Sequence, residues 1–167
     1  MNLHYGMEIN ADGHLEISGC DTVELAKQYG TPLYVVDEDF LRNNCRKFKN
    51  AMDKYFEKGR VMYASKALNT KAILKIVDSE GLGIDTVSGG ELYTALTTGI
   101  DPKKLELHGN SKTKEEITMA VENGIYCIIA DGFDELEVIE EVCGELQKPI
   151  DVSIRLRPNI DVHAHHA

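Results

Sequence analysis

Lys66 is the residue in this sequence whose type and position best suit covalent chemistry. It lies in the segment VMYASKALNT, residues 61–70, between an apolar run typical of a buried strand and a polar pair typical of a helix start. An amine at a strand exit can be a point charge for a phosphate or carboxylate, or can form a Schiff base with a carbonyl group. The alternative is a loop lysine whose amine only contacts solvent. The spacing of the residues alone does not decide between these interpretations of Lys66.

Other polar side chains fall within or just past the C-terminal parts of further predicted strands. In a barrel of β/α units, functional residues collect at the C-terminal ends of the strands. Helix caps collect there too, so each residue has a structural alternative. The residues concerned are Ser65 and Lys66, Asp85 and Ser88, His108 and Asn110, Asp131, and Arg155 and Arg157.

The elements that would position these residues alternate along the chain. Helical patterns follow the strand-like stretches, and this alternation predicts parallel strands joined by crossovers. An open nucleotide-binding sheet usually has a glycine-rich turn after its first strand, whereas here that strand runs into VVDEDF. The pattern therefore favours a (β/α)8 barrel. Strands are predicted at 33–36, 61–64, 82–87, 105–108, 126–130 and 152–156, and helices at 37–57, 70–79, 90–98, 114–123 and 133–146.

Composition excludes several classes of protein. The 167 residues carry a formal net charge of -10, which argues against nucleic acid or an anionic membrane as partner. No apolar run approaches the ~20 residues of a membrane span, and the N-terminus has no secretory signal. The four scattered cysteines are typical of reduced thiols in a cytoplasmic protein.

Several segments in order along the chain resemble the fold-type III pyridoxal-phosphate decarboxylases. They are TPLYVVDEDFLRNNCR, VMYASKALNT, GLGIDTVSGGELYTAL, LELHGNSKTKEEI and SIRLRPNIDVHAHHA, and together they cover most of the chain from Thr31 onward. The YASKA and DTVSGGE segments are the most specific. The VSGGEL and RLRPN forms are more similar to the diaminopimelate decarboxylases than to the ornithine decarboxylases.

The resemblance implies roles for individual residues. Lys66 matches the lysine that binds pyridoxal 5'-phosphate covalently, and Ala64 a small residue beside the cofactor. Asp85 matches an acid close to that lysine, and Arg155 an arginine near the cofactor ring. His108 completes the candidate cofactor-binding set. Pairing with a neighbouring cation is the alternative for Asp85, and a structural charge in the barrel interior the alternative for Arg155.

Three motifs have a second interpretation. His108 and Asn110 can instead cap a helix at Ser111. Ser88-Gly89-Gly90 has the form of a phosphate cradle, but we interpret it as a helix start. His163, His165 and His166 have the spacing of zinc ligands, but no cysteine or carboxylate is spaced as a partner, so no metal is predicted.

The implied activity is decarboxylation of meso-diaminopimelate to L-lysine and CO2, by a homodimer acting on a small amino-acid substrate. An ornithine- or arginine-type decarboxylase, or an amino-acid racemase of the same fold, is the alternative enzyme. If the chain is not part of an enzyme, the alternative is a non-catalytic truncated barrel that binds a partner.

Length limits the expected architecture. A (β/α)8 barrel takes about 250 residues, so six predicted strands make a partial barrel of the alanine racemase-like type. Residues 31–167 would form this incomplete barrel, and residues 1–30 would join a C-terminal β-domain that the 167 residues lack. We expect these residues alone to be inactive and prone to association through unpaired strand edges.

Overall fold

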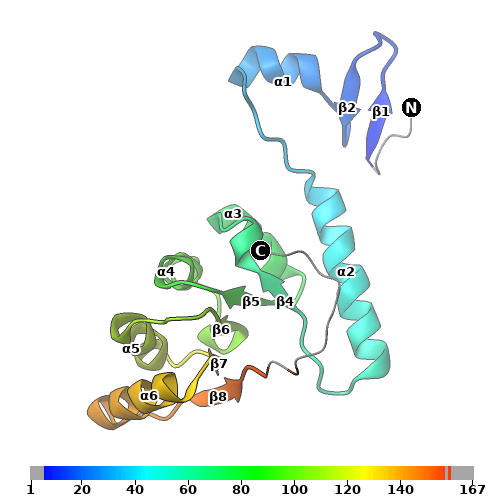
Figure 1. The fold of residues 1–167 in the computed structure, drawn as a ribbon. Helices are drawn as coiled ribbons and strands as arrows, with labels where there is room; N and C mark the ends of the chain where they lie inside the picture. The colour runs from blue at the N-terminus through cyan, green and yellow to red at the C-terminus, as the bar shows by residue number, and fades with distance from the viewer. Residues whose placement is uncertain (1–5, 157, 159–167) are drawn as a thin grey trace. The chain divides into compact units, whose positions relative to one another are not determined.

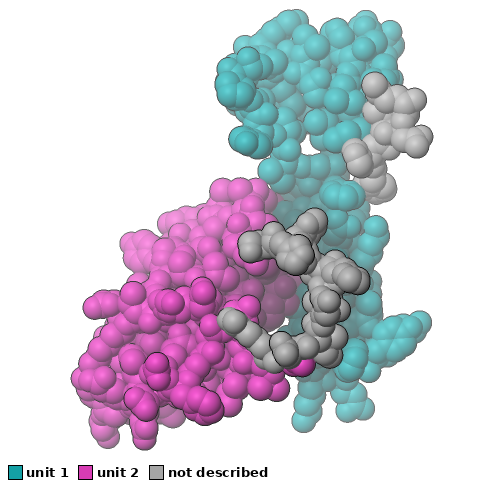
Figure 2. All heavy atoms as spheres, viewed as in Figure 1, with its two compact units in different colours: residues 1–61 teal, residues 62–167 magenta. Residues whose placement is uncertain are grey.

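A computed structural model describes residues 6–156 and residue 158. The chain divides into two compact units, Met1–Val61 and Met62–Ala167 (Figure 2). No helix among the described residues is long and apolar enough to cross a membrane.

The first unit contains a small antiparallel sheet and two helices. Strands β1 (Met7–Ile9) and β2 (Leu15–Ile17) form an antiparallel pair, and the two-residue strand β3 (Cys20–Asp21) extends it. Helix α1 (Thr22–Tyr29) begins after Asp21, because the Asp21 carboxylate accepts the Val23 and Glu24 backbone N–H groups. Helix α2 (Glu38–Tyr55) confirms the long amphipathic pattern.

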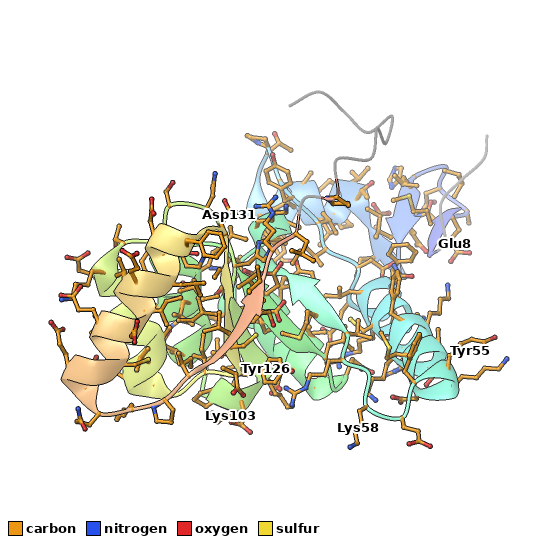
Figure 3. The ribbon with its side chains drawn as sticks, turned by 60° about the horizontal axis from the view of Figure 1, so that its bottom comes forward. Glu8, Tyr55, Lys58, Lys103, Tyr126 and Asp131 are labelled. Carbon is orange, nitrogen blue, oxygen red and sulfur yellow. The ribbon has the colours of Figure 1, made fainter. Side chains whose placement is uncertain are left out.

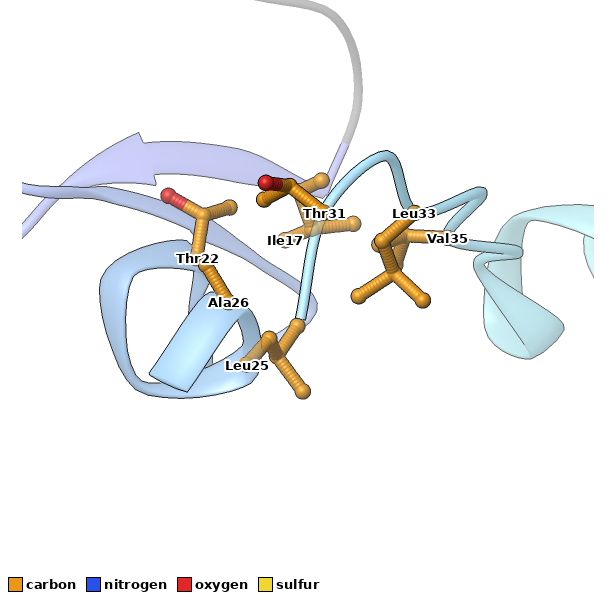
Figure 4. Close-up of a pocket in the computed structure, with 7 residues that line it drawn as sticks. All are labelled: Ile17, Thr22, Leu25, Ala26, Thr31, Leu33 and Val35. Carbon is orange, nitrogen blue, oxygen red and sulfur yellow. The ribbon is translucent and has the colours of Figure 1, made fainter. Parts of the chain in front are cut away.

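The predicted strand at 33–36 is not formed. A strand requires the backbone hydrogen bonds of a neighbouring strand, and none of the described strands pairs with these residues. Two of its side chains instead line an apolar pocket with residues of β2 and α1 (Figure 4). The pocket is lined by Ile17, Thr22, Leu25, Ala26, Thr31, Leu33 and Val35.

The second unit is a five-stranded parallel sheet in which each strand pairs with the next along the chain (Figure 1). Each of the four connections between these strands contains an α-helix, and these helices follow one another along the sheet. The strands are β4 (Met62–Ala64), β5 (Gly83–Thr86), β6 (Leu105–Leu107), β7 (Cys127–Ala130) and β8 (Asp151–Ile154). The helices are α3 (Lys71–Ser79), α4 (Gly89–Leu96), α5 (Lys114–Asn123) and α6 (Phe133–Leu146).

One face of this sheet forms the core. Ile84, Leu105, Leu107 and Ile128 are fully buried, and so are helix residues such as Leu74. Side chains alternate between the faces of a strand, so the residues between these buried ones face away from the helices. Asp85 and Glu106 belong to this second face and are only partly buried.

The strand order identifies the fold class. A doubly wound sheet reverses its strand order at a switch point, whereas the five described parallel strands run in sequence order without reversal. The prediction of a partial β/α barrel is therefore confirmed, with five parallel strands described where six were expected. Apart from 33–36, the predicted strand bounds are correct within two residues. The apolar stretches of β5, β6 and β7 bury one face of the sheet, whereas the residues of β8 are exposed.

Candidate active site

The C-terminal ends of the parallel strands meet at one edge of the sheet. Figure 3 shows Asp131, which follows β7, at one edge, and Lys103 and Tyr126, which precede β6 and β7, at the opposite edge. Lys66, His108 and Arg155 follow β4, β6 and β8 at the same edge as Asp131. The predicted convergence of polar residues at this edge is therefore present in the structure.

Ala64, Asp85 and Glu106 occupy neighbouring positions on three adjacent strands. Ala64 pairs in register with Asp85, and Asp85 pairs with Glu106. Registered residues of a parallel sheet share a face, and these three are on the face opposite the buried core. A small side chain at Ala64 beside two acids leaves space next to the end of β4.

Lys66 lies in the short 3-10 helix Ser65–Ala67 that follows β4. Its side chain is exposed, and it forms no hydrogen bond or ion pair with another residue of 6–156. Ser65, in contrast, is fully buried, and its Oγ lies 2.9 Å from the Asp85 carbonyl oxygen and 2.6 Å from Glu91 Oε2, two acceptors for its one hydroxyl hydrogen. The strand exit is thus held in place while the amine stays accessible.

Asp85 is the acid whose environment is most altered. Burial raises the pKa of its carboxyl group above the ordinary value, His108 and Lys66 oppose this rise, and Glu91 adds to it. Its Oδ1 atom is buried and has no hydrogen-bond partner among the described residues, and neither has Oδ1 of Asn69. Buried carboxylate oxygens normally have partners, so Asp85 has an acceptor position available for a bound group.

His108 directly follows β6 and is half-buried. Its backbone N–H donates to the Thr86 carbonyl oxygen at 2.7 Å. The alternative of a helix cap at Ser111 is wrong for both His108 and Asn110, because α5 begins at Lys114 with Thr113 as its N-cap. A capping box between Thr113 and Glu116 already satisfies this helix start.

Arg155 is fixed by the neighbouring strand. Its backbone N–H donates to the Ala130 carbonyl oxygen at 2.9 Å, and its guanidinium contacts Asp131 Oδ1 at 3.2 Å. Lys66 and His108 are therefore close enough to Asp85 to influence its pKa. Arg155 forms its ion pair with Asp131.

Two further predictions concern phosphate and metal. Ser88 caps α4, which begins at Gly89, so the helix-start interpretation of Ser88-Gly89-Gly90 is confirmed. The described residues contain no group of three or more histidine, cysteine or acidic side chains suited to a metal ion. Arg157 and the histidines His163, His165 and His166 lie outside the described residues.

Sequence reasoning missed Glu91 as a member of this site. Its carboxylate accepts from Ser65 and also from the Val87 backbone N–H at 3.0 Å. The signal was present, because Ser88 and Glu91 have the spacing of a helix capping box. A local capping pattern does not predict that the glutamate also contacts the preceding strand exit.

The chain matches the model of a known protein family over most of its length. Residues 39–167 match the family model described as "Pyridoxal-dependent decarboxylase, pyridoxal binding domain". The chain therefore belongs to the pyridoxal-dependent decarboxylases, and its expected cofactor, pyridoxal phosphate, is that of the family.

Among individual proteins, the chain is similar to diaminopimelate decarboxylases. The chain is 46% identical over 165 residues to the diaminopimelate decarboxylase of Bacillus methanolicus, and 44% identical to that of Bacillus subtilis. Each alignment covers 99% of this chain and 38% of the relative, so the chain spans well under half the length of these proteins.

Solved structures agree with this similarity. The diaminopimelate decarboxylase of M. jannaschii in complex with L-lysine has a TM-score of 0.85 at 38% identity, covering 94% of this chain and 37% of that one. The lysine/ornithine decarboxylase of Vibrio vulnificus has a TM-score of 0.70 at 23% identity, covering 89% of this chain and 38% of that one. The second of these shows the shared fold only.

The residues present fit an aldehyde cofactor. An accessible amine at Lys66 can bind an aldehyde covalently. Ala64 adds no bulk beside it, and the partnerless Asp85 Oδ1 can accept a hydrogen bond from a bound group. The chemistry of these residues therefore fits pyridoxal phosphate, with Lys66 as the residue that would hold it.

Proposed function

We propose that this chain supplies the cofactor-binding lysine of a diaminopimelate decarboxylase, which converts meso-diaminopimelate to L-lysine and CO2. The observation that carries the proposal is the accessible amine of Lys66 beside an acid with an unfilled acceptor position, Asp85. The identity to diaminopimelate decarboxylases over 99% of the chain supports the substrate.

Each residue of the proposed site has a distinct task. Lys66 would hold the cofactor through its Nζ atom, and the contacts of Ser65 with Asp85 and Glu91 keep that lysine at the strand exit. Pyridoxal phosphate, when bound, accepts the electron pair released when the α-carboxyl group leaves as CO2. Ala64, His108 and Arg155 would complete the cofactor-binding set, with Arg155 oriented by Asp131.

The pKa of the Asp85 carboxyl group is raised above that of an ordinary aspartate, so this group is more easily protonated. Its burial favours the neutral carboxyl form, whereas positive charge at Lys66 or His108 favours the carboxylate. The carboxylate form of Asp85 would therefore accompany a positively charged Lys66 or His108, and the neutral form would be favoured when that positive charge is lost. The charge of the lysine and the acid would thereby remain coupled.

The wider organisation is also a proposal. Residues 1–30 would pair with a C-terminal β-domain, and residues 31–167 would belong to the cofactor-binding barrel. We further propose a cytoplasmic location, which the scattered cysteines support, and a homodimer, which the resemblance to the decarboxylase family implies.

Substrate comparison tests this function. We would purify the complete protein that contains residues 1–167, add pyridoxal phosphate and measure CO2 release from meso-diaminopimelate, ornithine, arginine and L-lysine. The proposal predicts that kcat/KM for meso-diaminopimelate exceeds the others by at least about 10²-fold, the discrimination that a few buried contacts provide. Comparable rates on ornithine or arginine would assign the protein to the polyamine branch. Racemisation without CO2 release would assign it to the racemases.

A further inference from the structure

The helices that follow β5, β6 and β7 share a glutamate at the same position. Glu91, Glu116 and Glu135 are each the third residue of their helix, α4, α5 and α6. Each accepts a backbone N–H from the loop before its own helix, at distances of 2.8 to 3.0 Å from the nitrogens of Val87, Thr113 and Asp131.

Each of these glutamates also contacts the preceding β/α connection. Glu91 accepts from Ser65 Oγ, Glu116 from the Gly89 backbone N–H at 2.6 Å, and Glu135 from Lys112 Nζ at 2.9 Å. The three contacts therefore connect four consecutive β/α connections at the edge of the sheet where the candidate site lies.

The contact between Lys112 and Glu135 is the one that joins two buried charges. The Lys112 side chain is 2% exposed and that of Glu135 is 10% exposed. Besides both oxygens of Glu135, Lys112 Nζ donates to the Gly109 carbonyl oxygen at 2.7 Å and the Ile129 carbonyl oxygen at 2.8 Å. A buried ammonium with this many acceptors holds its surroundings in one arrangement.

The segment that Lys112 holds is the loop that carries His108. Gly109 follows His108 directly and has a φ of +93°, and a Cβ atom there would lie 2.6 Å from the Val87 carbonyl oxygen. A side chain cannot be accommodated at this position, so the loop is packed against the end of β5. Its Gly109 carbonyl is anchored by Lys112, and the neighbouring His108 is thereby kept beside Asp85.

We propose that Lys112 is a positioning residue, which fixes the loop 108–112 and so sets the place of His108 at the cofactor. Lys112 itself donates to Gly109, Ile129 and Glu135, and contacts neither Lys66 nor Asp85. The effect of Lys112 on cofactor binding rests on the proposed function, because it requires that the cofactor binds at Lys66. The effect of Lys112 on the order of loop 108–112 does not depend on the cofactor.

Three variants of the complete protein separate positioning from folding. Lys112→Met removes the ammonium but leaves Glu135 buried without its cation. Lys112→Met combined with Glu135→Gln removes both charges, and the amide oxygen can still accept the Asp131 backbone N–H. Lys104→Met is the matched control, because Lys104 pairs with Asp78 at 2.6 Å at the opposite end of the same strand, β6.

Two measurements are made on each folded variant. The first is amide hydrogen exchange of the peptide 105–113 in the cofactor-free protein, with thermal melting alongside. The second is the affinity for added pyridoxal phosphate, together with kcat and KM and borohydride labelling of Lys66.

We expect the double variant to regain most of the melting temperature lost by Lys112→Met, yet to exchange the 105–113 peptide at least about tenfold faster than wild type. Its cofactor affinity should fall about 10–100-fold, the range in which supporting residues act at metal sites, while Lys66 is still labelled. Lys104→Met should change neither quantity. Wild-type exchange and cofactor affinity in the double variant would overturn the proposal. So would failure of both Lys112 variants to fold when Lys104→Met folds, because Lys112 would then serve the fold as a whole.

Failure of the proposed function gives a different pattern. In that case wild-type protein shows no cofactor labelling at Lys66, while exchange of the 105–113 peptide still reports whether Lys112 holds the loop.

Discussion

Ser65 and Glu91 join the exit of β4 to the first turn of α4 through a hydrogen bond of 2.6 Å between Ser65 Oγ and Glu91 Oε2. Ser65 is fully buried and directly precedes Lys66. The same carboxylate oxygen accepts the Val87 backbone N–H at 3.0 Å, so Glu91 connects the ends of β4 and β5. The accessible lysine is thus attached to a rigid part of the sheet.

Substitution of Glu91 should therefore destabilise the strand ends. Glu91→Leu leaves the Val87 N–H without its acceptor and should lower the free energy of unfolding by about 1–3 kcal/mol, the cost of a buried unsatisfied donor. Glu91→Gln retains an acceptor oxygen and should cost less. Urea unfolding of the cofactor-free protein measures both.

Glu137 supplies the control for this comparison, because it is an exposed glutamate of α6. Glu137→Leu should change the free energy of unfolding by no more than about 0.5 kcal/mol. Equal effects of Glu91→Leu and Glu137→Leu would contradict the role given to Glu91.

Asp85 should make stability depend on pH. Burial raises the pKa of the Asp85 carboxyl group in the folded state above its ordinary value in the unfolded chain. At a pH between these two pKa values, the folded protein therefore binds more protons than the unfolded chain. The contribution of Asp85 to stability is then greatest below the unfolded pKa and is lost as pH rises through the folded pKa.

The Asp85→Asn variant isolates this effect. Its stability relative to wild type should improve as pH rises from 3 toward 8 in the cofactor-free protein. The unpaired amide of the variant costs the same free energy of unfolding at every pH. The change with pH in the stability difference between variant and wild type therefore reports only the Asp85 carboxyl group. A wild-type advantage that grows with pH would mean that the Asp85 carboxylate is paired in the folded state.

Much of the second unit could be predicted from the sequence, because its strands bury an apolar face and its helices carry local start signals. Ser88 and Thr113 cap α4 and α5 with side chains whose hydrogen bonds span only three residues, so the pattern is complete within a short segment. The absence of a strand at 33–36 could not be predicted, because strand formation depends on a distant partner and not on local composition.

The same distinction applies to the site. The convergence of Lys66, Asp85 and His108 can be predicted, because residues at the C-terminal parts of successive parallel strands meet at one edge of the sheet. The contacts Ser65–Glu91, Lys112–Glu135 and Arg155–Asp131 join residues 23 to 26 positions apart. Such pairings depend on the strand register and on the directions of side chains from distant segments. The sequence of a single segment does not determine either.

The central claim is that the amine of Lys66 holds the cofactor, and peptide mapping after borohydride reduction tests it most directly. Reduction of the complete protein with pyridoxal phosphate should attach the cofactor to one peptide, which contains Lys66. Lys66→Ala and Lys66→Arg should abolish this labelling and lower kcat by at least about 10³-fold, because neither an alanine nor a guanidinium can bind the aldehyde at neutral pH. Lys71, an exposed lysine five positions away in α3, provides the control, and Lys71→Ala should leave labelling intact. Labelling of a lysine outside residues 61–75, or undiminished labelling in Lys66→Ala, would contradict the account.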